Sequence, residues 1–322
     1  MQANKTLFFA IIGGAVLAVA LMFAAVAWLR SSGTELTPPS QKIDIEVVAA
    51  PGLKDWVTQA ANDFNASQTN ITVRVSEATE LVPSSKFQTA AAWIPEATFV
   101  AASAGRNFSS GGSVASSGLA WGAYSDKLAA FQQVYGELSW DSLHAKATSA
   151  EGLKLIIDSP RTSGAGLAAL ASAAAAQQGT NQLTEANVGA ATAWLTETLG
   201  NNNAQARAEA AATLASVQGR SIADVGLLPL AAWRRVKLDQ SDQFTVLPAQ
   251  PAVSLDHPFV IVTDNAEAQS AATAFKDFLL KPEQQAKLAD AGFDAAGAVS
   301  GGVQLDAAAV QRLHSWADVT LR

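Results

Sequence analysis

Hydrophobic residues along this chain form one long uninterrupted run, followed by many short segments that alternate with polar stretches. The run covers residues 7–29, LFFAIIGGAVLAVALMFAAVAWL, and contains no charged residue. As a helix it would be about 35 Å long, enough to cross the roughly 30 Å hydrocarbon core of a bilayer. We therefore expect residues 1–30 to form an N-terminal transmembrane anchor or signal segment. Residues 31–42 are polar and contain proline, which predicts a short tether.

Two interpretations of the apolar run stay open. The triplet at 25–27, Ala-Val-Ala, has the small-x-small form of a signal-peptidase site, and cleavage there would release the protein. The run is longer than the usual signal core and continues through Trp28 and Leu29, which favours an uncleaved anchor. Either interpretation sends the body out of the cytoplasm. We expect a single-pass protein of the cell membrane with its body on the extracytoplasmic side.

Beyond Ile43 the pattern changes to short strands that alternate with helices. A helix begins near Lys54, where Trp56, Ala60 and Phe64 form one apolar stripe at helical spacing. Strands are predicted at 43–49, 71–76, 155–158, 224–230, 244–247 and 259–262, and further helices at 162–178, at 265–280 and after Pro282. This alternation predicts an α/β fold with helices on both faces of open sheets. In such sheets ligands bind beyond the carboxyl ends of strands.

Composition and charge exclude several classes of function. The 322-residue chain has no cysteine, which excludes a disulfide scaffold, a thiolate nucleophile, a cysteine zinc site and a lipidated-cysteine anchor. Two of its 21 basic residues, Lys5 and Arg30, flank the apolar run, so 19 basic residues face 28 acidic ones in the remainder. A body this acidic lacks the basic surface that nucleic-acid binding requires. We expect no nucleic-acid partner.

Catalytic and metal-binding motifs are missing from the sequence. The three histidines, His144, His257 and His314, are widely separated, and no HExxH pattern occurs. There is also no GxSxG, GxxxxGK[ST] or GxGxxG motif. We therefore expect a protein that is not an enzyme, with no metal and no cofactor.

The sharpest local signal is the segment 158–166, DSPRTSGAG, which joins a predicted strand to a long helix. Thr162 or Ser163 can cap that helix, and Gly164 and Gly166 leave the backbone amides accessible. Free amides at the positive end of a helix dipole favour an anion or a carbonyl oxygen. An ordinary capped helix without a ligand explains the same residues.

Two other segments are candidates for ligand contacts. Pro51 and Gly52 follow the first strand of the body, where a tight strand-to-helix turn is the alternative explanation. The segment 109–117, SSGGSVASS, is predicted to be a flexible loop by its composition, and it would also supply hydroxyl and amide donors.

The order of several short segments resembles the bacterial extracellular solute-binding protein family, which has a type 2 periplasmic-binding-protein-like fold. The similarity is greatest to the branch often fused to a von Willebrand A domain, which is absent here. Seven pieces carry the resemblance: AWIPE at 92–96, GSVASS at 112–117, LSWDSL at 138–143, SPRTSG at 159–164, ADVGLLP at 223–229, LDHPFV at 255–260 and AFKDFLLKPEQQ at 274–285.

The resemblance implies two α/β lobes with a ligand cleft between them. It places 43–119 and 250–322 in the first lobe and 120–249 in the second. The ligand contacts that it implies are Pro51, Gly52, Ser116, Ser117, Thr162, Ser163 and Gly164. Arg161, at the start of the turn before the long helix, is a further candidate. Two positions depart from the family pattern: Gly118, where Ser-Ser usually continues with proline, and Leu230, where a polar residue is common after Pro229.

Together these features predict a membrane-anchored extracytoplasmic solute-binding protein. It would capture a small-molecule ligand, with an anionic group as one option, between its two lobes, and serve a transporter or act as a sensor. The alternative is a non-catalytic envelope scaffold or complex subunit that keeps the fold without binding a solute.

Overall fold

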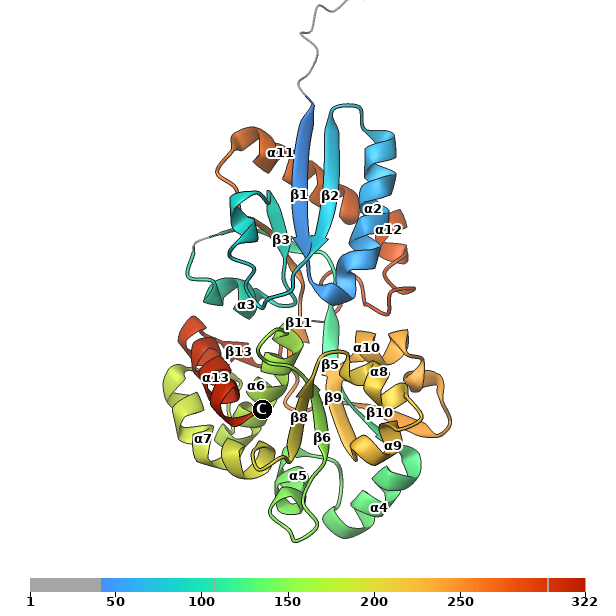
Figure 1. Ribbon diagram of the computed structural model, residues 1–322, viewed down its shortest axis with the longest axis vertical. Helices are drawn as coiled ribbons and strands as arrows, with labels where there is room; N and C mark the ends of the chain where they lie inside the picture. The colour runs from blue at the N-terminus through green and yellow to red at the C-terminus, as the bar shows by residue number, and fades with distance from the viewer. Residues whose placement is uncertain (1–41, 107, 300, 322) are drawn as a thin grey trace, which may run out of the picture. The chain divides into compact units, whose positions relative to one another are not determined.

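The computed structural model describes residues 42–106, 108–299 and 301–321, which form two mixed β-sheets flanked by helices (Figure 1). The expected anchor or signal at 1–30, and the tether as far as residue 41, lie outside these described residues. Among the residues that are described, no helix is long and apolar enough to cross a bilayer.

The first sheet combines strands from the beginning and the end of the body. Its order is β2 (Ile71–Glu77), β1 (Ile43–Ala49), β3 (Ala92–Ile94), β12 (Pro258–Ile261) and β4 (Ser109–Ser113). Strand β1 is parallel to β2 and β3, whereas β12 is antiparallel to β3 and β4. Helices α2 (Lys54–Ser67) and α11 (Ala266–Leu279) pack against this sheet and each other, with Phe64 edge-on to Phe275 and Phe278.

The second sheet has the order β10 (Phe244–Pro248), β5 (Ser117–Tyr124), β9 (Val225–Pro229), β6 (Leu155–Asp158) and β8 (Ala204–Arg207). Strands β9, β6 and β8 are parallel, and β5 runs antiparallel to its two neighbours, β9 and β10. The two-residue strand β11 (Ser254–Leu255) also pairs with β5. Helix α6 (Gly164–Gln178) is buried along most of its length because its alanines are apolar on every side and permit close packing.

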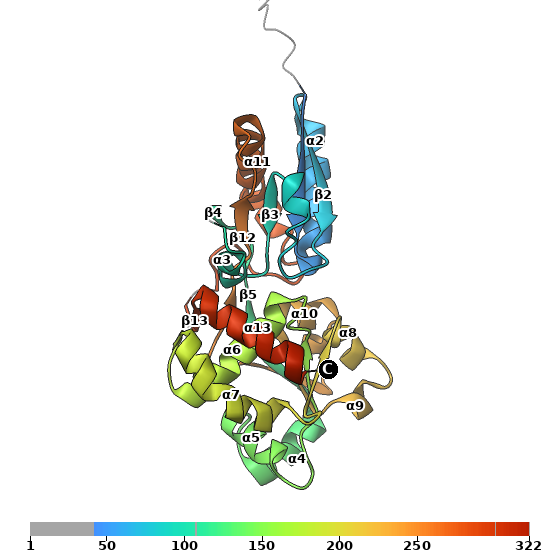
Figure 2. The same cartoon turned by 60° about the vertical axis from the view of Figure 1, so that its left-hand side comes forward.

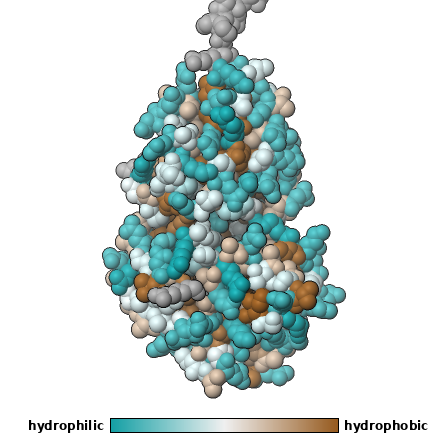
Figure 3. All heavy atoms as spheres, viewed as in Figure 1, coloured by the Kyte–Doolittle hydropathy of each residue, from teal (hydrophilic) through white to brown (hydrophobic). Residues whose placement is uncertain are grey.

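The remaining helices complete both layers. They are α3 (Thr98–Ser103), α4 (Ser125–Tyr135), α5 (Trp140–Ala147), α7 (Glu185–Leu199), α8 (Ala210–Ala215), α9 (Gly219–Ile222), α10 (Leu230–Arg235), α12 (Pro282–Ala286) and α13 (Ala307–Thr320), with 3₁₀ turns at Pro51–Leu53, Lys86–Gln88 and Leu238–Gln240. The surface shown in Figure 3 is mostly hydrophilic, with hydrophobic residues in separate patches.

The chain passes between the two sheets in three places, and these crossings lie side by side. They are residues 114–116, 249–257 and 294–303, and the first and third are joined by a β-bridge between Ser116 and Asp294. Beyond the third crossing, β13 (Gln304–Leu305) pairs with β7 (Gln182–Leu183), and α13 packs on α7 and α6 as well as on α3 (Figures 1 and 2). The segment after residue 303 therefore lies beside the second sheet, whereas the resemblance assigned it to the first lobe.

The predicted α/β class is confirmed, and so are the strands at 43–49 and 155–158. The loop predicted at 109–117 is partly wrong, because residues 109–113 form β4. This strand lies at the edge of the first sheet and is paired on one side by β12, so backbone hydrogen bonding compensates for its poor strand propensity.

Candidate functional site

A cavity with a volume of about 890 Å³ lies between the two sheets. Its walls are the carboxyl ends of six parallel strands: β1, β2 and β3 of the first sheet, and β6, β8 and β9 of the second, each represented by its last residue or by the turn that follows. The α10 helix, the crossing at Leu255 and His257, and Phe293 complete the lining. This is the position where α/β sheets bind ligands.

Four of the residues that the sequence predicts as ligand contacts line this cavity. Pro51 and Gly52 belong to the 3₁₀ turn after β1, and Thr162 and Ser163 immediately precede α6. The two turns are more than 100 residues apart in the chain, and the fold brings them to one cavity. Their contact with a ligand stays a prediction.

The other four candidates lie elsewhere. Ser116 is fully buried, where its hydroxyl donates to the carbonyl of Ala295 at 2.7 Å and accepts from the Val299 amide at 3.2 Å. The Ser117 hydroxyl, equally buried, accepts a hydrogen bond from the amide of Ala231. Ser116 therefore joins the first and third crossings, and Ser117 joins β5 to the start of α10.

Arg161 and Gly164 also have structural surroundings. The guanidinium of Arg161 pairs with the Asp318 carboxylate at 3.0 Å and donates to the carbonyls of Asp318 and Leu321, so it holds the end of α13. At Gly164 an added Cβ would lie 2.8 Å from Val100 and 3.0 Å from the Glu96 carboxylate. Gly164 is therefore required for close packing on the segment that contains Glu96.

The start of α6, expected to receive an anion from a ligand, is occupied by a carboxylate of the chain itself. Oε2 of Glu96 accepts hydrogen bonds from the Ser163 hydroxyl at 2.9 Å and from the Ala165 amide at 2.6 Å. Burial raises the pKa of the Glu96 carboxyl, and these hydrogen bonds partly offset that increase. In the sequence Glu96 stood out only as part of AWIPE, one of the pieces that carry the family resemblance, and nothing in the pattern linked it to α6.

Asp158 and Arg235 are further cavity residues that were not predicted as contacts. Burial, together with the nearby charge of Glu96, raises the pKa of Asp158 to about 7. Arg235, the last residue of α10, donates from Nη1 to the carbonyl of Gly52 at 3.2 Å, and its guanidinium lies 5.6 Å from the centre of the Phe293 ring. This side chain therefore connects a helix of the second sheet to the turn after β1.

The adjacent residue makes a second connection of the same kind. Nη1 of Arg234 donates to the carbonyl of Gly292 at 3.1 Å and to the carboxylate of Asp294 at 2.9 Å. Together with the hydrogen bonds of Glu96 to the start of α6, the two arginines join the walls of the cavity across the gap between the sheets.

His257 lies in the cavity wall with only 3% of its surface exposed, and neither ring nitrogen has a hydrogen-bond partner. Burial lowers the pKa of this imidazole to about 3, so it is neutral at physiological pH. The ring stands edge-on to Phe293, with centroids 5.1 Å apart. Buried polar atoms in folded proteins nearly always have partners, so an unpaired imidazole beside a cavity suggests a role in binding.

The backbone of His257 is also unusual. Its φ of 36° lies in the left-handed region, which is unfavourable for a residue with a side chain. Two hydrogen bonds hold it there, from its amide to the carbonyl of Glu96 at 3.2 Å and from the amide of Val114 to its carbonyl at 3.1 Å. The imidazole is thereby fixed against the strand end that carries Glu96.

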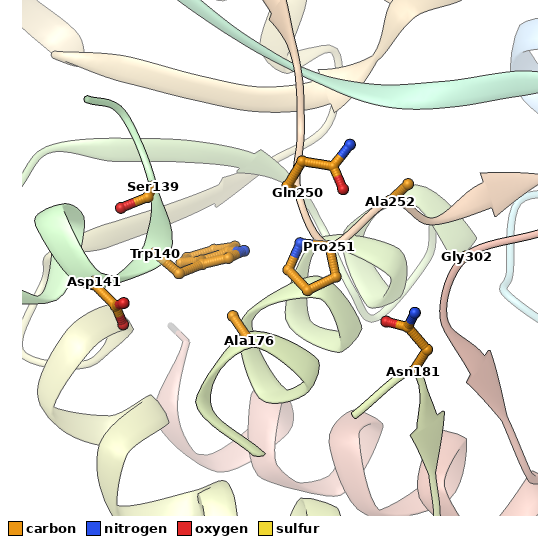
Figure 4. A pocket seen from close by; sticks show the side chains of 9 residues that line it. All are labelled: Ser139, Trp140, Asp141, Ala176, Asn181, Gln250, Pro251, Ala252 and Gly302. Atoms are coloured by element: carbon orange, nitrogen blue, oxygen red, sulfur yellow. The ribbon is translucent and has the colours of Figure 1, made fainter. Parts of the chain in front are cut away.

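A second cavity, of about 400 Å³, lies beside the start of α5 and the crossing segment at 250–252 (Figure 4). Trp140 and Pro251 face each other in its wall, and Asp141 supplies its one charged lining residue. The indole N–H of Trp140 already donates to Ser172 at 3.0 Å. This cavity contains none of the strand-end turns, so the larger one is the candidate site.

The groups around the larger cavity are suited to binding. Its lining combines carboxylates, guanidinium and ammonium groups, small alanines and the Phe293 ring. Within the described ranges, no three His, Cys, Asp or Glu side chains come close enough together to hold a metal ion.

Several solved structures have the same fold at low sequence identity. The sulfate-binding protein SubI from Mycobacterium tuberculosis matches with a TM-score of 0.56 and 18% identity, over 87% of this chain and 92% of that chain. The periplasmic binding protein AfuA from Actinobacillus pleuropneumoniae, with fructose-6-phosphate bound, matches with a TM-score of 0.59 and 15% identity, over 87% and 98% of the two chains. Iron-bound HitA from Pseudomonas aeruginosa matches with a TM-score of 0.57 and 15% identity, over 86% and 97%.

Comparison with curated proteins and with family models gives the assignment. No curated protein matches this chain in sequence. The model of the family described as bacterial extracellular solute-binding protein matches residues 45–294, which include both sheets and the lining of the larger cavity. The chain therefore belongs to the bacterial extracellular solute-binding protein family.

Proposed function

We propose that this chain is a non-catalytic binding protein that captures one small solute in the 890 Å³ cavity between its two sheets. The observation that carries the proposal is the convergence of six strand ends, three from each sheet, on that cavity. A volume of this size suits a small organic molecule, because ligand cavities commonly measure about 300–1,000 Å³.

In this proposal the two sheets are the cores of two lobes, and the solute binds between them. Residues 43–116 and 250–303 make the first lobe, and residues 117–249 and 304–321 the second, since β5 belongs to the second sheet and β13 and α13 pack beside it. Pro51 and Gly52 contact the solute from the first lobe, and Thr162 and Ser163 from the second. Arg235 connects the lobes beside it through Gly52.

The test is a binding screen with the full-length protein purified in detergent micelles. The protein is dialysed to equilibrium against a bacterial metabolite extract, and compounds retained with it are identified by mass spectrometry. Retention of a defined small molecule at one per chain supports the proposal. If nothing is retained above the level of a protein-free micelle control, the protein does not bind a solute.

The same proposal places the protein on the outer side of a membrane, where it delivers its solute to a transporter. Two observations support it: the apolar run at residues 7–29 and the extracellular location that the family description gives. Membrane fractionation and intact-mass measurement test it. If all of the protein is recovered in the soluble fraction and its first residue is Trp28, the protein is cleaved and not anchored.

A second candidate function is an envelope scaffold without a solute. One observation favours it: Glu96, Arg234 and Arg235 connect the walls of the cavity through hydrogen bonds within the protein. A scaffold of this kind would retain nothing in the dialysis experiment and would co-purify with other envelope proteins after crosslinking.

A further inference from the structure

The polar groups of the cavity also indicate which class of solute it accepts, and this inference rests on the proposed function. We infer that the solute carries a cationic amine, and that its ammonium group binds the carboxylate of Asp158. Three observations lead to this assignment. The cations of the cavity are already bonded within the protein, the anion position at α6 is filled by Glu96, and among the described residues no side chain is bonded to Asp158 or to the ring of His257.

The basic side chains that line the cavity have partners within the protein. Nζ of Lys54 pairs with the carboxylate of Glu77 at 3.0 Å. Arg207 donates to the side-chain oxygen of Gln205 from two nitrogens, at 3.0 and 3.2 Å. Arg235 donates to the carbonyl of Gly52 and stacks on Phe293. An oxyanion would have to compete with these contacts for each cation.

The start of α6 is also unavailable to an oxyanion. Its donors, the Ser163 hydroxyl and the Ala165 amide, are bonded to Glu96. An incoming anion would displace that carboxylate and leave it partly buried without hydrogen bonds, next to a second carboxylate at Asp158. Burying unpaired charges of the same sign is strongly unfavourable.

Acceptors, by contrast, are in excess. Five acidic residues line the cavity against three basic ones: Asp55, Glu77, Glu96, Asp158 and Glu209 against Lys54, Arg207 and Arg235. Within the described part of the chain, no side chain donates a hydrogen bond or an ion pair to the carboxylate of Asp158.

His257 provides an independent indication of a ligand. Its imidazole is nine-tenths buried in the cavity wall, and neither nitrogen is paired. Because burial keeps the ring neutral, one of its nitrogens is an acceptor and offers no positive charge to an anion. Asp158 already accepts a hydrogen bond from the backbone amide of Ala210 and lies within the field of the Arg235 guanidinium, and no side chain of the described residues is bonded to it. An ammonium group would add the charge-assisted hydrogen bonds that this carboxylate does not receive from a side chain, and such bonds are the strong ones.

The experiment compares solutes of equal size and different charge. Full-length protein in detergent micelles is dialysed against a bacterial metabolite extract supplemented with a defined mixture. The mixture contains two sets of an amine, an uncharged compound and a carboxylate: butane-1,4-diamine, butane-1,4-diol and succinate, and glucosamine, glucose and gluconate. It also contains sulfate and phosphate. Retained compounds are identified by mass spectrometry, and the affinity of the best one is measured by calorimetry. We expect every retained compound to carry an amine.

The Asp158→Asn variant then tests the residue. It keeps the size of the side chain and removes the charge, and we expect it to weaken binding of the retained amine at least tenfold. The Asp242→Asn variant, at an exposed position before β10, is the matched control and should leave the affinity unchanged. Near-UV circular dichroism confirms that both variants are folded.

The outcomes are distinct. Retention of only sulfate, phosphate, a carboxylate or an uncharged compound overturns the assignment of the solute class and leaves the binding function intact. Unchanged amine affinity in Asp158→Asn overturns the role of Asp158. Retention of no compound from either the defined mixture or the extract contradicts the binding function itself.

Discussion

Replacing Asp158 by asparagine is expected to stabilise the ligand-free protein, by an amount that increases with pH. Burial and the charge of Glu96 raise the pKa of Asp158 from 3.8 to about 7. In the unfolded chain the carboxyl ionises near its ordinary pKa. As pH rises between these two values, ionisation therefore stabilises the unfolded state more than the folded state. The aspartate therefore costs no stability below pH 4, and its cost is complete above pH 7.

The size of the effect follows from the shift. Each pKa unit corresponds to about 1.4 kcal/mol, so a shift of about three units corresponds to roughly 4 kcal/mol. Asp158 is only partly buried and faces an open cavity, where solvent reduces this figure, so we expect about 2–4 kcal/mol. Asparagine has the same shape and does not ionise. The difference in unfolding free energy between variant and wild type should rise by this amount from pH 4 to pH 7 and then stay level.

Urea unfolding at pH 4, 5.5, 7 and 8, followed by far-UV circular dichroism, measures this difference. His257 titrates in both proteins, so its contribution cancels in the comparison. The Asp242→Asn control replaces an exposed carboxylate, and its difference from wild type should stay within about 0.5 kcal/mol throughout. A difference for Asp158→Asn that does not change between pH 4 and pH 7 would refute the reasoning, because it would show that Asp158 ionises normally in the folded protein.

Three further predictions follow from the site. Ser163→Ala removes the cap of α6 and one hydrogen bond to Glu96, and should lower the unfolding free energy by about 1–2 kcal/mol; an unchanged urea midpoint would contradict this. In His257→Asn the asparagine tolerates the left-handed backbone and carries no titrating group. Because burial lowers the pKa of His257, the wild type should lose stability as pH falls from 6.5 towards 3. The melting temperature of the variant should therefore fall less than that of the wild type between pH 7 and pH 5. Arg161→Ala should release the end of α13 to limited proteolysis without changing ligand affinity, whereas a loss of affinity would show that Arg161 contacts the ligand after all.

Part of the site could be predicted because its signals are local. Ser163 caps α6 through hydrogen bonds to amides two and three residues later, and Pro51 begins a turn directly after β1. Such features depend on neighbouring residues, so capping and turn preferences are sufficient to find them. Ser116 and Ser117 show the limit of the same reasoning. Their composition predicts a polar loop, yet both are buried where crossing segments meet.

The sequence by itself determined the α/β class, the bounds of β1 and β6, and the position of both turns at strand ends, because periodicity, caps and glycines act over a few residues. Only the tertiary structure decided that Glu96 fills the start of α6, that Arg235 reaches Gly52, and that His257 is unpaired in the cavity wall. Glu96 and Ala165 at the start of α6 lie 69 residues apart in the sequence, and Gly52 and Arg235 lie 183 residues apart. Their meeting depends on how two sheets assembled from distant strands are placed by the three crossings, and no local preference encodes that placement.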